Sequence, residues 1–242
     1  MILKDGKTET LDTRCGLIFQ DDLTAPNLLA MAPPDGGIDL RERELISKYR
    51  VKKFGDPLLN QREWSACAGF GFAAALEHEP GICTLGDDWA LQFYFRVQDN
   101  DQWPGSERPG SDPISKGTSL FATLQTAKQE GLITEHCRAR TVEEVIRGIA
   151  YYGSAILGLE WTEGMMEPRE DGLSIPSGEL VGGHCAAGTF VNLHQNIIGG
   201  PNSWPHWNRR RKGYWVMDLD DFGEVLRRGE CAFARKVPGV HI

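Results

Sequence analysis

Four side chains of this sequence have the chemistry needed for acyl transfer through a thiol. Cys67 lies where a loop gives way to a run of small residues that predicts a helix, and Gln61 precedes it. A thiol at a helix N-terminus feels the positive end of the helix dipole, so we expect a lowered pKa for Cys67. Farther along the chain, His184 follows two glycines and Asn202 begins an Asn-Ser-Trp segment.

Each residue type fits one step of such a reaction. His184 would take the proton of Cys67 and return it to a leaving amine. The side-chain oxygen of Asn202 would accept the imidazole N–H and fix the ring. Gln61 would donate its amide, beside the Cys67 backbone N–H, to a developing oxyanion. Taken singly, a cysteine at a helix start or a histidine in a glycine turn is more often structural, so the argument depends on the four together.

The predicted elements change character along the chain. Helices are predicted over residues 67–79, 87–97, 118–130 and 142–152. Thr141 and Glu144 form a capping box for the last of them. Short strands are predicted over residues 154–161, 184–193, 195–198, 213–218 and 231–236. Helices first and strands later predict an α+β fold with segregated lobes, and a cleft between the lobes would bring Cys67 to His184.

The region before the helices has a different composition, with patches rich in proline and glycine around a charged stretch at residues 39–53. That stretch could form a short helix. We expect the region to wrap around the lobes as an arm, and a partly disordered extension is the alternative. The predicted units are an arm at 1–57 and a catalytic domain at 58–242, with a helical lobe at about 67–135 and a β lobe at about 140–240.

Composition argues for a globular protein and against several partners. Of the 242 residues, 40% are hydrophobic and 25% charged, which is ordinary for a soluble domain. The net charge of −8 gives no support to nucleic-acid binding, and the basic run at 209–212 is interpreted as a solvated loop. No apolar run approaches the roughly 18 residues that predict a membrane span. The six cysteines form no CxxC pair, which favours free thiols in a reducing, cytoplasmic-type compartment.

The order Gln–Cys–His–Asn resembles that of the papain-like cysteine peptidases. The segment Asn202-Ser203-Trp204, with Trp207 and Gly213-Tyr214 after it, resembles the signature of that family. The resemblance covers about residues 56–235. It implies a two-lobe fold, with a helical left lobe whose central helix starts at the nucleophile and an antiparallel, β-barrel-like right lobe.

The resemblance also implies an activity. A member of this family hydrolyses peptide bonds through a thioester acyl-enzyme, with Cys67, His184, Asn202 and Gln61 in the catalytic roles. Trp204 would cover the His–Asn hydrogen bond and keep water from competing for it. The partner would be a protein or peptide substrate, and neither a cofactor nor a metal is implied.

The sequence departs from the family pattern at four positions near the site. Ala68 stands where the family usually has tryptophan, and Trp64 where many members have a disulfide cysteine. Pro205 and Asn208 replace glycines, which could alter the turn near Asn202. The stretch before the nucleophile is also shorter than the helical pro-segment of secreted members. We therefore expect an enzyme that is made active, or one that is controlled by its location or by its own N-terminal arm. The short length resembles that of bacterial or phage-encoded members.

Other functions stay open. A papain-like module could serve as a structural or binding subunit of a larger assembly, such as a phage virion, with or without activity. Cell-wall peptide hydrolysis is a second enzymatic alternative, although such enzymes usually have a shorter Cys-to-His separation and lack the Asn-Ser-Trp segment. A metal site built from His78, His194 or His206 with cysteines has no recognisable ligand spacing.

Overall fold

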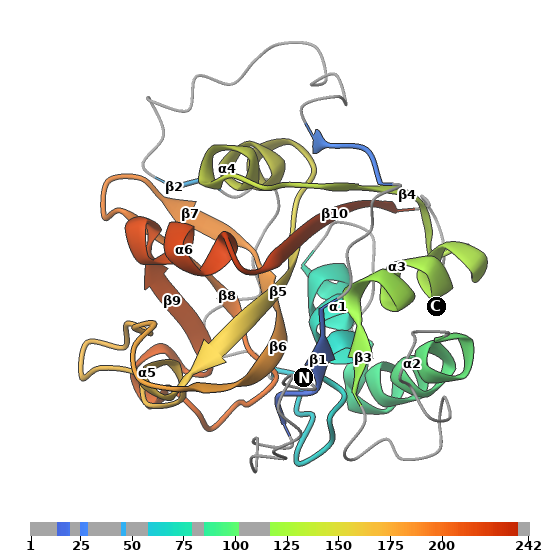
Figure 1. Cartoon of the computed structure of the whole chain (residues 1–242), viewed down its shortest axis with the longest axis horizontal. Coiled ribbons are helices and arrows are strands. Elements are labelled where there is room, and N and C mark those ends of the chain that lie inside the picture. Colours follow the sequence, from blue (N-terminus) through green and yellow to red (C-terminus); the bar gives the residue numbers. More distant parts are fainter. Residues whose placement is uncertain are drawn as a thin grey trace, which may run out of the picture.

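The first three helices and most of the strands occupy different sides of the molecule (Figure 1). The computed structural model describes residues 14–19, 25–28, 45–46, 58–78, 85–101 and 117–236. The helices on one side are α1 (Cys67–Glu77), α2 (Gly86–Asn100) and α3 (Leu120–Gln129). The strands on the other side are β5 (Ala155–Thr162), β6 (Leu180–Gly188), β7 (Phe190–Asn192), β8 (Ile197–Pro201) and β9 (Tyr214–Asp218). The predicted α+β class with segregated halves is confirmed. The exact division into an arm and a catalytic domain stays a prediction.

Eight of the ten strands in the described residues form two four-stranded antiparallel sheets, and the other two form a parallel pair. The first has the order β4-β10-β5-β6, with β4 (Ile133–Arg138) and β10 (Glu230–Lys236) as the strands that connect the two halves of the chain. The second has the order β2-β7-β8-β9, and β2 (Leu45–Ile46) comes from the N-terminal region. Hydrophobic side chains of the first sheet face two cores in alternation, so this sheet separates the helical half from the second sheet.

One sequence prediction is wrong at β2. Leu45 and Ile46 lie in the middle of the stretch 39–53 that could form a helix, but they pair antiparallel with Asn192 and Val191. The edge of β7 supplies backbone partners there, which outweighs a weak local preference for helix. The rest of the stretch 39–53 lies outside the described residues.

The predicted helix ends are confirmed where capping residues mark them. Thr141 and Glu144 form the complete capping box of α4 (Val142–Tyr151). Ser119 caps α3 by accepting the N–H of Ala122 at 3.0 Å, and Gly131, at φ +71°, follows its end. The helix α2 continues to Asn100, beyond the predicted end at residue 97. Strand β4 and the helices α5 (Glu163–Met166) and α6 (Leu219–Leu226) were not predicted.

Helix α1 lies at the centre of the fold because glycines let its neighbours approach closely. A Cβ at Gly69 would lie 2.7 Å from the Cβ of Tyr94 on α2. A Cβ at Gly71 would lie 2.7 Å from the sulfur of Cys185 on β6. Every α1 residue before Glu77 is buried, so the helix is enclosed by α2 on one side and β6 on the other. Among the helices of the described residues, none is both long and apolar enough to cross a bilayer.

Candidate active site

The structure places Cys67 at the first residue of α1, as the sequence predicted. Its side chain is completely buried, and backbone groups of Cys185, Gly16 and Ala68 form hydrogen bonds to the thiol. Burial is the dominant influence and raises the pKa of Cys67 to about 11, while those hydrogen bonds oppose the rise. The expectation of a lowered pKa is therefore wrong for this structure, because removal of the thiolate from water outweighs the helix dipole.

His184 and Asn202 form the predicted pair. His184 lies on β6, and Asn202 follows the last residue of β8. The Nε2 atom of His184 lies 2.8 Å from the Oδ1 atom of Asn202, and both residues are buried. The same oxygen accepts the backbone N–H of Ser203 at 2.8 Å, which identifies it as the acceptor. His184 thus donates through Nε2, and its Nδ1 is the nitrogen left for proton transfer.

Tryptophans enclose this pair, which the sequence predicted only for Trp204. The ring of Trp204 stacks on the imidazole of His184, with 4.2 Å between centroids and an interplanar angle of 27°. Trp161 of β5 packs edge-on against the same imidazole at 4.8 Å. Trp207 lies 6.0 Å from Trp204 and donates its N–H to the carbonyl of Met166 at 2.7 Å. The His–Asn bond is thereby kept from water, which strengthens it.

Gln61 is held in place from the Asn202 side. Its backbone N–H donates to the carbonyl of Ser203 at 3.0 Å, and its Oε1 accepts the hydroxyl of Ser203. Since Oε1 is fixed as the acceptor, Nε2 must point away from Ser203. Ser203 therefore connects Gln61 to Asn202 and is a positioning residue that sequence reasoning missed. The signal was its place within the Asn-Ser-Trp segment.

The packing of α1 on β6 brings Cys67 to the histidine strand. Cys67 is hydrogen-bonded to the backbone of Cys185, the residue that follows His184. Gly71, one turn later on α1, contacts the side chain of Cys185. The predicted residues Cys67, His184, Asn202 and Gln61 thus gather at one place from α1, β6 and the segments before α1 and after β8.

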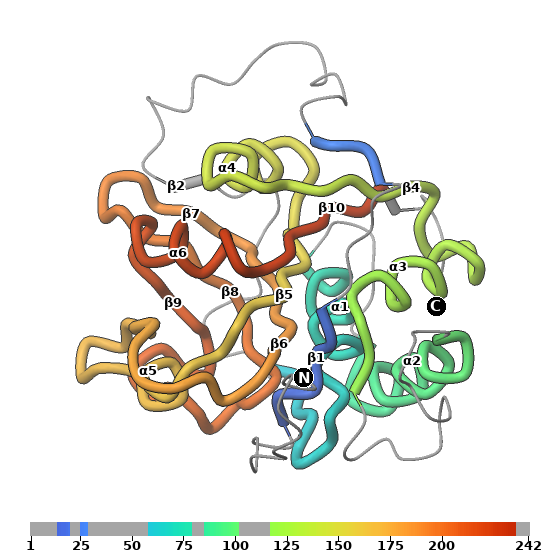
Figure 2. The backbone as a smooth tube through the Cα atoms, in the orientation of Figure 1, coloured from blue at the N-terminus to red at the C-terminus, as the bar shows by residue number. Residues whose placement is uncertain are grey.

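Residues 14–19, named here the covering segment, pass over this place. Strand β1 (Leu17–Ile18) pairs in parallel with β3 (Thr118–Ser119), and Gly16 forms a bridge with Gly183, next to His184. The segment lies between the helical half and β6 in Figures 1 and 2, where β1 is drawn in blue. The structure therefore joins the two sides of the site through a piece of its own chain.

The covering segment can approach its neighbours closely because glycines lie at the points of contact. A Cβ at Gly16 would lie 2.5 Å from both the Cβ and the carbonyl oxygen of Ser65. A Cβ at Gly183 would lie 2.2 Å from the carbonyl oxygen of Leu17, and one at Gly117 would lie 1.7 Å from that of Gly16. Such separations show that the covering segment packs directly against the neighbouring backbone.

The covering segment also accepts a hydrogen bond from the side-chain amide of Gln61. The Nε2 group of Gln61 donates to the carbonyl of Arg14 at 3.0 Å and to that of Trp64 at 2.7 Å. The guanidinium of Arg14 lies over the ring of Trp204, 4.9 Å from its centroid. The amide predicted to hold an oxyanion thus holds a carbonyl oxygen of the chain itself.

Solved protein structures with similar architecture were found. Xylellain, a cysteine protease from Xylella fastidiosa, has a TM-score of 0.57 and 13% identity, covering 96% of this chain and 99% of that one. Digestive procathepsin L2 proteinase from Tenebrio molitor larval midgut has a TM-score of 0.61 and 12% identity, covering 93% and 79%. ProCathepsin B S9 from Trypanosoma congolense has a TM-score of 0.56 and 10% identity, covering 93% and 88%. No family model and no curated protein sequence matches the chain.

The chain has the papain-like cysteine peptidase fold. The departures from the family pattern are accommodated within that fold. Asn208 adopts a left-handed conformation with φ +44°, which asparagine tolerates better than most residues, and donates to the carbonyls of Gly172 and Tyr214 at 3.0 and 2.8 Å. Asn202 keeps its backbone bond to the carbonyl of Gly213 at 3.1 Å. Replacement of glycine at 205 and 208 therefore leaves the His–Asn pair in place.

Among the residues that the structure describes, no group of three or more His, Cys, Asp or Glu side chains could hold a metal ion. The five cysteines in this part of the chain, Cys15, Cys67, Cys137, Cys185 and Cys231, are buried and form no disulfide with one another.

Displacing the covering segment should expose the thiol. A Gly16→Ala substitution would place a methyl group against Ser65, and overpacking of this kind costs about 1–3 kcal/mol. We expect Cys67 to react about 5- to 100-fold faster with iodoacetamide at neutral pH, since about 1.4 kcal/mol is tenfold in population. Peptide mapping by mass spectrometry would assign the labelled cysteine.

Gly223→Ala is the matched control. Gly223 lies in α6, and a Cβ there would meet only Val142 at 3.3 Å. Its labelling rate should equal that of the unaltered protein. An equal rate in Gly16→Ala, with the melting temperature unchanged, would show that the segment does not limit access to Cys67.

Proposed function

We propose that the chain is a cysteine peptidase whose reaction is carried by Cys67, His184, Asn202 and Gln61. The observation that supports this most directly is the buried 2.8 Å contact between His184 and Asn202 beneath Trp204, on the strand that packs against the nucleophile helix. A merely structural histidine would not require an acceptor, a stacked indole and a nearby buried thiol together.

In the proposed reaction, the thiol proton of Cys67 passes to Nδ1 of His184, and the sulfur attacks the carbonyl carbon of a peptide bond. The carbonyl oxygen becomes an oxyanion that accepts from Nε2 of Gln61 and from the backbone N–H of Cys67. The amine leaves with the proton from His184, which gives a thioester. Water then attacks the thioester, with His184 taking and returning the proton, and the carboxylate product is released.

Asn202, Trp161 and Trp204 act on the proposed reaction through His184. The bond to Oδ1 of Asn202 keeps the proton on Nε2, so Nδ1 faces the proton transfer. Burial under Trp204 keeps the ring in one orientation. The substrate class is protein or peptide, and no nucleic acid, cofactor or metal enters the proposal.

The covering segment bears on the alternatives. The side-chain amide of Gln61 already donates to the carbonyl of Arg14 in this segment. In this proposal, substrate can therefore enter only after residues 14–19 move. A structural or binding subunit of a larger assembly would be consistent with a site that stays covered. The two functions differ in whether Cys67 can be acylated once the segment is displaced.

The peptidase proposal is tested with an epoxide-type cysteine-peptidase inhibitor on the Gly16→Ala protein. We expect one adduct, on Cys67, and hydrolysis of a fluorogenic peptide mixture that Cys67→Ala abolishes. His184→Ala should reduce the rate by about 10²–10⁴, the usual contribution of a positioned base. Activity that survives in Cys67→Ala, or an adduct spread over the other cysteines, would refute the proposal.

The coupling of Gln61 to Ser203 gives a second test. Gln61→Ala removes an oxyanion donor and should lower kcat by about 10²–10³. Ser203→Ala keeps this donor but removes the hydroxyl that fixes the Gln61 amide, so the amide can rotate. We expect kcat to fall in this variant too, by a smaller factor. Thr189→Ala, a buried hydroxyl on a different segment, is the control and should keep kcat. A Ser203→Ala enzyme with unchanged kcat would show that Ser203 does not position Gln61.

A further inference from the structure

The indole of Trp204 has a charged neighbour from the covering segment. The guanidinium of Arg14 lies over this ring, 4.9 Å from its centroid. The backbone carbonyl of the same residue accepts from Nε2 of Gln61 at 3.0 Å. Arg14 therefore occupies both the amide that would hold the oxyanion and the indole of Trp204. Trp204 is buried in this arrangement, and movement of the covering segment would uncover the part of its ring under the guanidinium.

The proposed reaction determines which residue of a substrate reaches this ring. The carbonyl of the scissile bond lies at Nε2 of Gln61, and His184 passes its proton to the leaving amine. The residue that begins with this amine therefore lies beside His184 during the proton transfer. The ring of Trp204 stacks on the imidazole of His184, with 4.2 Å between centroids. The side chain of the first residue after the scissile bond is thus the one that lies next to Trp204.

The indole is held in one orientation by the rings around it. Trp161 packs against Trp204 at 5.8 Å between centroids with an interplanar angle of 89°, and Trp207 packs against it at 6.0 Å and 82°. With His184 stacked on the same ring, three neighbours fix the indole from different directions. A ligand that binds over this ring therefore meets a surface that is already in place, which lowers the entropic cost of binding.

We propose that this site selects peptides that carry arginine, or less strongly lysine, directly after the scissile bond. Tryptophan attracts a cation through the face of its ring more strongly than tyrosine or phenylalanine does. Arginine also stacks on an aromatic face with its planar guanidinium, which a lysine ammonium cannot do. Arg14 shows that a guanidinium fits over Trp204. This inference rests on the proposed peptidase function and names the substrate class of that site.

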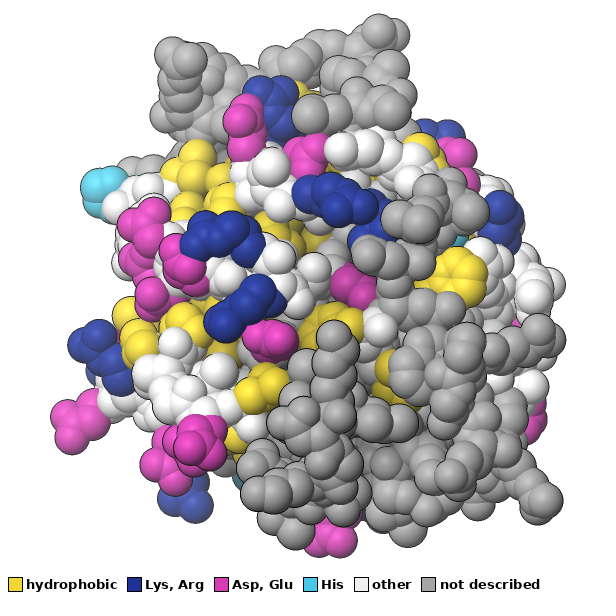
Figure 3. All heavy atoms as spheres, viewed as in Figure 1, with side chains coloured by type: hydrophobic (Ala, Val, Ile, Leu, Met, Phe, Trp, Pro, Cys, Tyr) yellow, Lys and Arg dark blue, Asp and Glu magenta, His cyan; other side chains and the backbone are white. Residues whose placement is uncertain are grey.

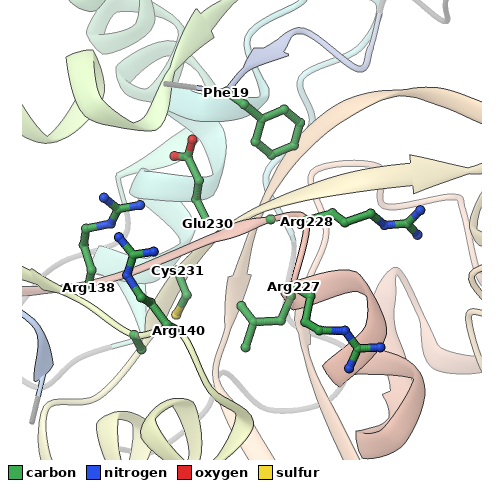
Figure 4. A pocket seen from close by; sticks show the side chains of 10 residues that line it. Phe19, Arg138, Arg140, Arg227, Arg228, Glu230 and Cys231 are labelled. Carbon is green, nitrogen blue, oxygen red and sulfur yellow. The ribbon is translucent and has the colours of Figure 1, made fainter. Parts of the chain in front are cut away.

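The other end of the covering segment offers no comparable contact for a cation. Its last residue, Phe19, lines a pocket of about 490 Å³, and none of the other lining residues is aromatic. Four of them are arginines, and the one acid, Glu230, already has an interaction partner. Figure 4 shows Phe19 and Glu230 on one side of β10 and Arg227 on the other.

The surface near this end is also basic. In the space-filling view of Figure 3, Lys and Arg side chains gather near the middle of this face, over α6 and β10. A basic substrate residue therefore gains nothing at this end of the covering segment. The preference for arginine should be confined to the position after the scissile bond.

The preference is measured on the Gly16→Ala protein with peptides of mixed sequence that carry arginine, lysine, citrulline or norleucine at one fixed position. Mass spectrometry of the products identifies the cleaved bond. We expect cleavage directly before arginine, with kcat/KM about 3- to 30-fold higher than before citrulline, because a cation over an indole contributes in that range. Citrulline has the length and shape of arginine without its charge. Equal rates before these two residues, or a preference for arginine at another position, would overturn the proposal.

A variant of the ring tests the contact itself. Trp204→Phe should lower kcat/KM for every peptide, since Trp204 also covers His184. The ratio of arginine to citrulline is free of this general loss, and we expect it to fall at least about twofold. Trp207→Phe is the matched control, because it makes the same exchange in the neighbouring ring and leaves the ring under Arg14 in place. Its ratio should stay unchanged. An unchanged ratio in Trp204→Phe would contradict a contact with this ring.

Binding without hydrolysis separates this inference from the peptidase proposal. The double variant Gly16→Ala/Cys67→Ala has no nucleophile, so titration calorimetry can compare an arginine peptide with its citrulline analogue. We expect the arginine peptide to bind about 3- to 30-fold more tightly. Selective binding in a protein that never cleaves peptides would support the cation site and refute the peptidase. Equal binding of the two peptides, in a protein whose parent does cleave, would refute the cation site alone.

Discussion

The close packing of α1 against β6 is the contact on which the candidate site depends. Gly71 offers no side chain to the sulfur of Cys185, so the helix can lie directly on the strand. Cys67, one turn earlier, reaches the backbone of Cys185, and His184 is the adjacent residue of that strand. Because both side chains come from regular elements, their relative position is set by packing rather than by a loop.

Burial has opposite consequences for the two halves of the site. For His184 and Asn202, enclosure by Trp161 and Trp204 protects a neutral hydrogen bond and is favourable. For Cys67, complete burial disfavours the charged thiolate and raises its pKa to about 11. The structure therefore brings the four residues of the proposed catalytic site together while Cys67 is held as a protonated, unreactive thiol. The covering segment lies against this thiol, because a backbone group of Gly16 forms a hydrogen bond to it.

Much of this arrangement could be predicted from local sequence. The run of small residues after Cys67 predicted a buried helix, and Thr141 with Glu144 predicted the start of α4. The order of Gln61, Cys67, His184 and Asn202 predicted which residues would meet. These features depend on short-range preferences or on a recognisable motif.

The remainder depends on contacts between distant segments. The pairing of β1 with β3 and the bridge between Gly16 and Gly183 join the N-terminal region to both sides of the site, and no local pattern indicates them. Leu45 and Ile46 form a strand because β7 offers an edge, not because of their own preference. The raised pKa of Cys67 follows from the same distant contacts, so a reading of helix position alone gave the wrong direction.

The central claim is that the covering segment holds an otherwise competent nucleophile as a neutral thiol. The most direct test is the pH dependence of alkylation at Cys67, compared between the unaltered protein and Gly16→Ala. The account predicts that the unaltered protein reacts appreciably only as the pH rises toward the raised pKa of about 11. In the variant, water reaches the thiol and the curve should shift to lower pH. Superimposable curves, or a thiolate already present at neutral pH in the unaltered protein, would contradict the account.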